Sequence, residues 1–364
     1  MTFRILFALV LCSLSLSGAD EHRDQWRSVA DALILTPPES YPFNWGEGVQ
    51  HIGLMKIYER TKDTRYADYV EKWTALYLGR DIKELLNIDG KRRPERQGYC
   101  GHWSPGTAIL YLHQARGKPE HLKLAESVAD FIRAGAERSP EGGLGHWLGS
   151  HQYWVDTLYM ACPLLTGLGK LQRKPEYIED AAGQILSYAK HMQEEKNGLF
   201  YHIWDWSKNE RSPSLWGRGN GWVLMSIADT MEFLPRKHTS YAPLRQVALQ
   251  MAAGLKTTQD AGGMWHTVLD DHASYPESSA TSMFCYGLLK LVRLKVLPAS
   301  GNVDMARKAW KAVNERYVEN GVVKGVSAGT GPGNSEHYKK IPLGSQTWGA
   351  GAYLMAGSEM DRLR

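Results

Sequence analysis

The stretch PSLWGRGNGW, residues 213–222, combines residue types that bind acidic sugars. Trp216 and Trp222 stand six positions apart and enclose three glycines and Arg218. An indole offers a flat face on which a sugar ring can stack, and a guanidinium can pair with a carboxylate through two parallel hydrogen bonds. Glycine permits unusual backbone dihedrals and the close approach of a ligand. These residues predict a uronate site, although a segment of this composition can also simply fill the space where helices meet.

Asp156 is the candidate catalytic acid. It lies in HQYWVDTLYMACPLL, residues 151–165, where its neighbours are nearly all apolar. Apolar surroundings raise the pKa of a carboxylic acid, so that it can donate a proton near neutral pH. The competing interpretation is that Asp156 caps a helix or interacts with its dipole.

His202 is the next candidate, since it stands between NGLFY and IWDW in a predicted long loop. An imidazole there could bind a carboxylate or relay a proton. A histidine on a surface strand is the simpler alternative.

Other aromatic and polar groups occupy similar positions after long loops. Trp45 follows one such loop, and the pair His102–Trp103 follows another. Glu277 and Thr281 are placed likewise, although a glutamate at a helix start is often a capping partner. The sequence has no P-loop, no GxGxxG after a strand, no HExxH and no GxSxG, and the Gly-rich GTGPGN at 329–334 lacks the Lys-Ser/Thr and the preceding strand of a phosphate-binding loop.

The elements that carry these residues read as about twelve helices joined alternately by short turns and long loops. Four segments share a plan in which one helical pattern ends, a short basic turn follows and a second pattern begins. A short piece of strand is predicted over Gly198–Ile203. The expected helices span 22–35, 48–60, 64–78, 104–116, 120–136, 155–171, 175–193, 219–234, 241–256, 277–294, 301–317 and 344–361.

This alternation predicts repeated helical hairpins with every long loop at the same end. An open solenoid is one solution. Six hairpins can also close into a ring, an all-α (α/α)6 barrel with inner and outer helices. Closure gathers the long loops 36–47, 79–103, 137–154, 194–218, 257–276 and 318–343 around one mouth, where functional residues are expected.

Composition and the N-terminus narrow the class of protein further. The chain has 364 residues, a net charge of +4 and 43% apolar residues, without the basic stripe that nucleic-acid binding requires. Arg4 and the apolar stretch Ile5 to Leu16 predict a signal peptide over 1–19, too short to anchor the chain in a membrane. The remainder, 20–364, is expected to be a single catalytic domain that is secreted or periplasmic.

The mature chain would keep three cysteines, Cys100, Cys162 and Cys285. The number is odd and no CxxC pair occurs, which argues against a disulfide framework or a zinc knot. Each is expected to be a buried structural residue.

Four segments together resemble the unsaturated uronyl hydrolases. WVDTLYMACPLL, LFYHIWD, WGRGNGW and ESSATSMFCYGLL occur in the order and spacing of glycoside hydrolase family 105, the unsaturated rhamnogalacturonyl hydrolases, with the unsaturated glucuronyl hydrolases of family 88 as relatives. The resemblance covers nearly the whole mature chain and implies an (α/α)6 barrel. It also implies an anionic unsaturated oligosaccharide as substrate, and neither a metal nor an organic cofactor.

The resemblance implies a hydration reaction instead of attack at the anomeric carbon. Asp156 would protonate carbon 4 of the double bond between ring carbons 4 and 5, and would then activate the water that adds at carbon 5. The hemiketal would open and release the glycosidic bond. His202 and Arg218 would hold the uronate or assist the water, and Trp216 and Trp222 would line the site.

One position departs from the family pattern. Family members usually carry a second Asp where alignment places Gly101, in YCGHWSPG. His102 could substitute for it, or the substrate could differ. Two alternative functions therefore stay open: a hydrolase of saturated glucuronides or a sugar epimerase on the same barrel, and a non-catalytic glycan-binding protein. The sequence identifies neither the glycan nor the oligomeric state.

Overall fold

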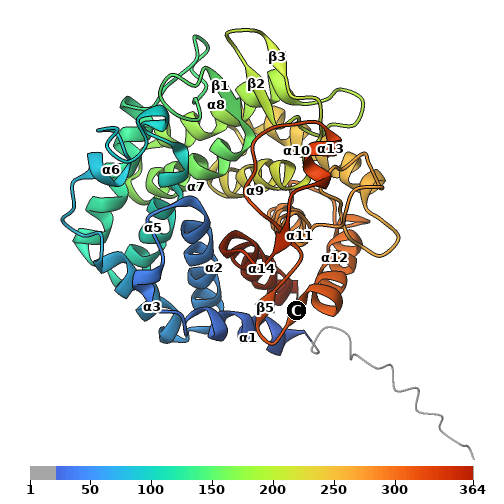
Figure 1. Cartoon of the computed structure of the whole chain (residues 1–364), viewed down its shortest axis with the longest axis horizontal. Coiled ribbons are helices and arrows are strands. Elements are labelled where there is room, and N and C mark those ends of the chain that lie inside the picture. Colours follow the sequence, from blue (N-terminus) through green and yellow to red (C-terminus); the bar gives the residue numbers. More distant parts are fainter. Residues whose placement is uncertain (1–21, 364) are drawn as a thin grey trace, which may run out of the picture.

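The computed structural model describes residues 22–363 as a closed ring of helices (Figure 1). The predicted signal peptide, 1–19, lies outside these residues. The twelve long helices are α1 (Arg23–Leu33), α2 (Trp45–Thr61), α3 (Thr64–Ala75), α5 (Ser104–Arg116), α6 (Pro119–Ala134), α7 (Val155–Gln172), α8 (Pro175–Met192), α9 (Gly217–Phe233), α10 (Tyr241–Thr258), α11 (Ser278–Arg293), α12 (Asn302–Tyr317) and α14 (Thr347–Met360).

Six of these helices form an inner ring and six surround it. The inner helices α2, α5, α7, α9, α11 and α14 pack against one another in that order, and α14 closes the ring against α2. Each inner helix pairs with an outer one. The predicted (α/α)6 barrel is therefore confirmed. Within residues 22–363, no helix is long and apolar enough to cross a membrane.

The sixth helix pair differs in its connectivity from the other five. Five pairs are hairpins with short turns, whereas the sixth joins α1 and α14 from opposite ends of the chain. The Trp26 indole N–H of α1 donates to the Leu354 carbonyl of α14 at 2.9 Å and fixes this pair. The first described helix of the chain is thus the outer partner of the last inner helix.

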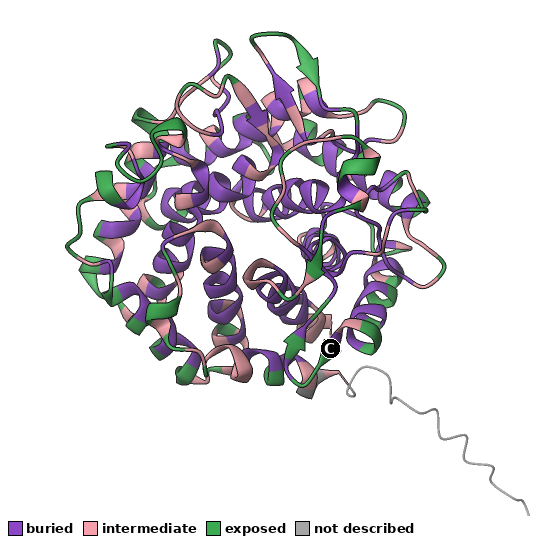
Figure 2. Cartoon of the chain, viewed as in Figure 1, coloured by how far each residue is buried: buried purple, intermediate pink, exposed green. Residues whose placement is uncertain are grey.

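The inner helices are buried on almost every face, as Figure 2 shows. In α9 every residue from Gly217 to Met231 is buried. The seam between α2 and α14 depends on glycine, because a Cβ at Gly351 would lie 2.3 Å from the Val49 carbonyl oxygen. Outer helices bury one face only, and for this reason their apolar residues recur at three- and four-residue spacing in the sequence.

Short strands organise the loops at the mouth. β1 (Gln152–Trp154), β2 (Ile203–Asp205) and β3 (Glu210–Arg211) form one antiparallel sheet. β4 (Val318–Glu319) pairs with β5 (Val322–Val323), and β6 (Val326–Ser327) with β7 (Leu343–Gly344). Two short helices, α4 (Ile82–Leu85) and α13 (Ser335–Lys339), complete these loops.

The strand predicted over Gly198–Ile203 is displaced. Only its last residue lies in β2, because Gly198 adopts a left-handed conformation with φ of 71° and turns the chain. The sheet has a direct consequence for the candidate acid. Trp154 pairs with Ile203, and the Val155 N–H donates to the His202 carbonyl at 3.1 Å, so Asp156 and His202 are brought side by side.

Candidate active site

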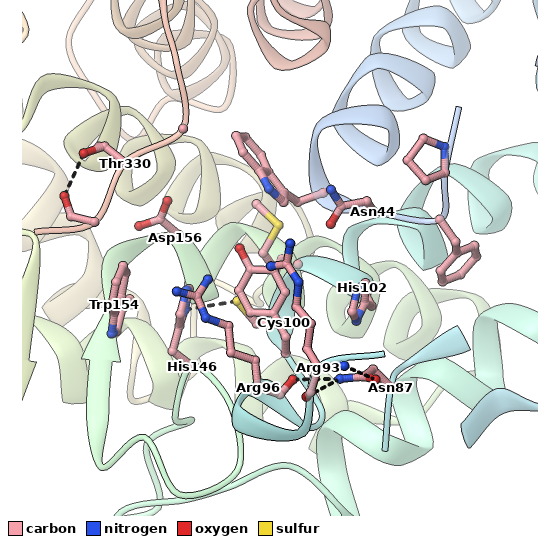
Figure 3. Close-up of a pocket in the computed structure, with 18 of the residues that line it drawn as sticks. Asn44, Asn87, Arg93, Arg96, Cys100, His102, His146, Trp154, Asp156 and Thr330 are labelled. Atoms are coloured by element: carbon pink, nitrogen blue, oxygen red, sulfur yellow. Dashed lines mark hydrogen bonds between the residues drawn. The ribbon is translucent and has the colours of Figure 1, made fainter. Parts of the chain in front are cut away.

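A cavity of about 550 Å³ opens at the mouth where the inner helices begin (Figure 3). Its wall comes from five loops and the helix starts that follow them. The lining includes 42–45, Asn87, 92–93, Arg96, 99–102, His146, Trp154, Asp156, Met160, Trp216, Arg218 and 329–331. The sequence prediction that the long loops deliver functional groups to one mouth agrees with this cavity.

Asp156 is held by a chain of two buried side chains. Its Oδ2 lies 3.2 Å from Nε2 of His202, and Nδ1 of that imidazole lies 2.7 Å from the Tyr338 hydroxyl. With Tyr338 donating to Nδ1, the hydrogen on Nε2 of His202 is donated to Asp156. The hydrogen bond described for the Asp156 carboxyl goes to His202 and not to the first N–H groups of α7, and Asp156 lines the cavity.

The pKa of Asp156 differs from the sequence-based expectation. Burial raises this pKa, but the hydrogen bond from His202 and the electrostatic interactions with His202, His146 and Arg218 together outweigh burial. The net pKa lies below its ordinary value. The prediction of a raised pKa was wrong, because Val155, Leu158 and Tyr159 are buried in the barrel while polar groups from other loops surround the carboxyl. Asp156 is therefore ionised near neutral pH in the free protein.

Arg218 is engaged with the loop above the cavity. Its two Nη atoms donate to the carbonyl oxygens of Ser327 and Ala328, each at 2.8 Å, and its Nε is buried without a partner. The guanidinium also lies 4.6 Å from the ring centre of Trp216. Burial lowers the pKa of Arg218, although Glu277 and Asp156 oppose that shift. Arg218 thus adds positive charge to the cavity wall while anchoring residues 327–328.

The three candidate tryptophans occupy different depths. Trp45 is half-buried at the cavity wall and packs on Trp348 at a ring distance of 4.2 Å. Trp216 lines the cavity but is 2% exposed, with His202 at 4.2 Å. Trp222 does not line the cavity: it is fully buried, stacks on Tyr159 and meets Trp45 edge-on. Trp222 therefore supports Trp45 from beneath, and Trp45 presents the most accessible indole.

Gly101 lies in the lining, and Tyr99 covers it. A Cβ at Gly101 would lie 2.3 Å from Cε1 of Tyr99, so this ring fills the space that a larger residue at 101 would need. His102 also lines the cavity. Its pKa falls to about 4, chiefly through burial and also through the charges of Arg92 and Arg93, so its imidazole is neutral.

His146 is a cavity residue that the sequence analysis did not name. Its Nδ1 lies 2.8 Å from the Thr157 hydroxyl and 3.1 Å from Sγ of Cys100, and its ring stacks on Trp154 at 4.3 Å. Burial lowers the pKa of His146 to about 3. The pair His146–Trp147 in a long loop resembles His102–Trp103, and this resemblance was a usable signal. The three cysteines are buried and unpaired.

The contacts of Glu277 and Thr281 show that these two candidates have structural positions outside the cavity lining. The Glu277 carboxylate accepts from the N–H groups of Ser279, Ala280 and Ser327, so it caps α11 and fixes the same loop that Arg218 holds. Thr281 is fully buried. Neither of the two lines the cavity, and the capping interpretation holds for Glu277. Tyr338, from α13, was missed because nothing in its local sequence distinguishes it.

Arg92, Arg93 and Arg96 were also missed, although the run KRRPER at 91–96 is visible in the sequence. All three line the cavity. Asp156 is the only carboxylate among the described residues of that lining, so the cavity wall carries an excess of positive charge.

Comparison with known proteins agrees with this geometry. The model of Glycosyl Hydrolase Family 88 matches residues 21–364. The unsaturated rhamnogalacturonyl hydrolase YesR of Bacillus subtilis is 29% identical over 337 residues, which cover 90% of this chain and 92% of YesR. An unsaturated 3S-rhamnoglycuronyl hydrolase of an Alteromonas species is 26% identical, covering 87% of this chain and 77% of the relative. A solved structure from Salmonella enterica, described as a possible member of the GH105 family, has a TM-score of 0.84 at 26% identity, with all of both chains covered.

Proposed function

This chain belongs to glycosyl hydrolase family 88, and we propose that it removes a 4,5-unsaturated uronic acid from the non-reducing end of lyase-generated oligosaccharides. The observation that carries the proposal is the Asp156–His202 pair on the wall of a positively charged cavity. The relatives named above as unsaturated rhamnogalacturonyl and rhamnoglycuronyl hydrolases support the same reaction class.

The cavity favours hydration over ordinary glycoside hydrolysis. Direct hydrolysis uses two carboxyl groups on either side of the glycosidic bond. Among the described residues that line this cavity, Asp156 is the only carboxylate. Hydration of a double bond needs one group that first gives a proton and then takes one. A hydrolase of saturated glucuronides is therefore the weaker candidate.

Asp156 must gain a proton before it can act as the acid. An incoming uronate carboxylate and the exclusion of water both favour the neutral form of a nearby carboxyl, so we expect substrate binding to raise the pKa of Asp156. The neutral acid then protonates carbon 4. The resulting carboxylate accepts a proton from the water that adds to carbon 5, which leaves the hemiketal that opens and releases the glycosidic bond.

The neighbours of Asp156 each have a part in this scheme. His202 orients the carboxyl, and Tyr338 fixes the imidazole tautomer that donates to it. The positive charge of Arg218 attracts the uronate to the wall that holds Asp156, and Trp45 offers the indole face for the sugar ring. Trp216 keeps the His202 imidazole in place by packing against it.

The test is the ultraviolet absorbance of the double bond in a panel of lyase-generated oligosaccharides from pectin, glycosaminoglycans and ulvan. We expect the absorbance to fall with at least one substrate. Asp156→Asn should fold normally and lower turnover by about 10²–10⁴-fold. A folded Asp156→Asn protein that retains activity, or release of saturated sugars with the absorbance unchanged, would contradict the proposal.

The cellular location is part of this proposal. The apolar stretch after Arg4 is that of a signal peptide, and we expect cleavage after Ala19 and a mature enzyme that is secreted or periplasmic. Mass spectrometry of the protein from exported fractions tests this, because an uncleaved chain that stays in the cytoplasm would refute it.

A further inference from the structure

Arg93 and Arg96 extend from their loop into the cavity, as Figure 3 shows. Neither guanidinium forms a hydrogen bond or an ion pair with another described side chain. Arg96 instead makes a cation–π contact, in which its guanidinium lies 5.1 Å from the ring centre of Trp147. A tryptophan face leaves the nitrogen atoms of such a group available to an anion.

One buried side chain fixes the loop that carries these arginines. Asn87 is 1% exposed, and its amide nitrogen donates to the carbonyl oxygens of Arg93 at 2.9 Å and Arg96 at 3.2 Å. Its amide oxygen accepts from the backbone N–H groups of Arg92 at 3.1 Å and Arg93 at 3.2 Å. Four hydrogen bonds therefore shape this segment before any ligand arrives, which lowers the entropic cost of binding.

The other cationic groups of the cavity are already occupied. Arg92 donates to the carbonyl oxygens of Glu84 and Leu85 at 2.8 and 2.7 Å. Arg218 holds the backbone of residues 327–328, and buried Glu277 offsets its charge. His102 is neutral, as described above. Arg93 and Arg96 are therefore the guanidinium groups of the cavity lining that the described residues leave without a hydrogen-bond partner, and no described carboxylate pairs with their charge.

A single uronate does not balance this charge. The uronate must bring carbon 4 to Asp156, beside His202 and Arg218. Arg93 and Arg96 lie on a separate loop, before α5, and that loop contributes no carboxylate to the described cavity lining. Uncompensated guanidinium groups at a preformed position in a cavity are typical of oxyanion recognition.

We propose that Arg93 and Arg96 form a second anion subsite, which binds a carboxylate or sulfate ester on the sugar linked to the unsaturated uronate. This inference rests on the proposed function and narrows its substrate class to oligosaccharides with at least two negative charges near the cleaved bond. Arg93 and Arg96 act there as specificity residues, apart from the chemistry at Asp156.

Matched unsaturated disaccharides test the proposal. Three substrates share the same unsaturated uronate and differ in the second sugar, which is neutral, sulfated or itself a uronate. We expect the wild-type kcat/KM to be higher for at least one charged substrate than for the neutral one. Arg93→Gln and Arg96→Gln should each reduce that preference roughly tenfold, because kcat/KM for the charged substrate falls more than kcat/KM for the neutral one.

Lys91→Gln is the matched control. Lys91 belongs to the same loop and carries the same charge, but it pairs with Asp89 and does not line the cavity. Its loss should leave all three rates unchanged. The preference of the wild type between the sulfated and carboxylated substrates identifies the group that is bound. Added salt should weaken the preference, because both arginines are accessible to solvent ions.

Two results would overturn the inference. One is an equal loss of kcat/KM on neutral and charged substrates in folded arginine variants, because it would mean that these residues hold the uronate itself or only maintain the loop. The other is the absence of any preference in the wild type. If the protein consumes no unsaturated substrate, calorimetry with the corresponding saturated disaccharides separates the two proposals, since charge-dependent binding lost in Arg93→Gln supports the subsite alone.

Discussion

Replacing Tyr338 with Phe should disturb catalysis through His202 without touching the substrate. The Tyr338 hydroxyl lies 2.7 Å from Nδ1 of His202, and that imidazole side chain is fully buried. The substitution removes one oxygen and keeps the ring. It leaves Nδ1 without its partner, so the proton of the imidazole is free to move from Nε2 to Nδ1. In that tautomer, a lone pair on Nε2 faces the carboxylate of Asp156 at 3.2 Å.

The size of the effect follows from these contacts. A buried acceptor left without its donor costs about 1–3 kcal/mol. Unfolding entropies of about 2.1 cal/mol/K per residue give about 0.8 kcal/mol per degree for this chain, so Tm should fall by about 1–4 °C. A charge-assisted hydrogen bond to Asp156 of about 1.5–3 kcal/mol corresponds to a loss in kcat of about 10- to 100-fold.

The pH dependence of the rate distinguishes a positioning role of Tyr338 from a structural one, because a loss of stability alone would not shift it. Asp156 must be protonated to act, so kcat/KM falls as pH rises through its pKa in the free enzyme. The hydrogen bond from His202 is one cause of the lowered pKa. Weakening that bond raises the pKa, and the limb of the profile should therefore move to higher pH.

Tyr353→Phe provides the matched control. The Tyr353 hydroxyl donates to Oδ1 of Asn314 at 2.6 Å, and both groups are buried outside the cavity. It should lower Tm by a similar amount and leave kcat and its pH dependence unchanged. If Tyr338→Phe matches Tyr353→Phe in activity and in pH profile, the argument that Tyr338 positions His202 fails.

Three further predictions follow from other contacts. In the wild-type enzyme, kcat should fall at a higher pH than kcat/KM does, because the bound uronate raises the pKa of Asp156. A fall of both parameters at the same pH would contradict this. Burial lowers the pKa of His51 to about 4, so the unfolded chain binds a proton that the folded one does not, and this destabilises the fold progressively as pH falls from about 6.5 to 4, by up to about 3 kcal/mol. Chemical denaturation across that pH range should show that the unfolding free energy of His51→Gln depends less on pH than that of the wild type. Gly351→Ala should destabilise the barrel by about 2 kcal/mol or more, because its Cβ would lie 2.3 Å from the Val49 carbonyl oxygen. Gly183→Ala, in α8 with nothing within 4 Å of the new atom, should instead stabilise it by about 0.5–1 kcal/mol, and equal Tm values for the two variants would refute the packing argument.

The sequence was most informative where local pattern and fold coincide. Outer helices have one apolar and one polar face, and basic turns separate them from their partners, so the hairpins were predictable from the pattern. The pattern left an open solenoid as an alternative, and the family resemblance implied the closed ring. Pairing of α1 with α14 was not predictable, because the Trp26–Leu354 hydrogen bond joins residues 328 positions apart. Local pattern placed Asp156 and His202 at the mouth, but their contact depends on the register between β1 and β2.

Predictions of chemical role were less secure than predictions of position. The neighbours of Asp156 in sequence suggested a raised pKa, while the groups that set the pKa come from the loops of His146, His202 and Arg218. Trp222 belongs to the expected motif, yet the helical turn after Gly217 directs it into the barrel, against Tyr159. The site-forming side chain that no pattern indicated was Tyr338, from a loop that follows the last outer helix.

The glycine at 101 and the arginines at 93 and 96 lie on the same loop and line the same cavity. The charge of Arg93 acts on both Tyr99 and His102, the residues that flank position 101. A carboxylate at 101 would therefore stand in the field of Arg93 and would offset part of its charge. Gly101 carries no such group, and the Tyr99 ring occupies the space beside it. The negative charge that the chain does not supply at this wall is the charge that we expect the substrate to bring. Gly101→Asp in a Tyr99→Ala background, which removes the clashing ring, should then reduce the preference for doubly charged substrates. If that variant folds and keeps the wild-type preference, the charge at position 101 and the anion subsite are independent.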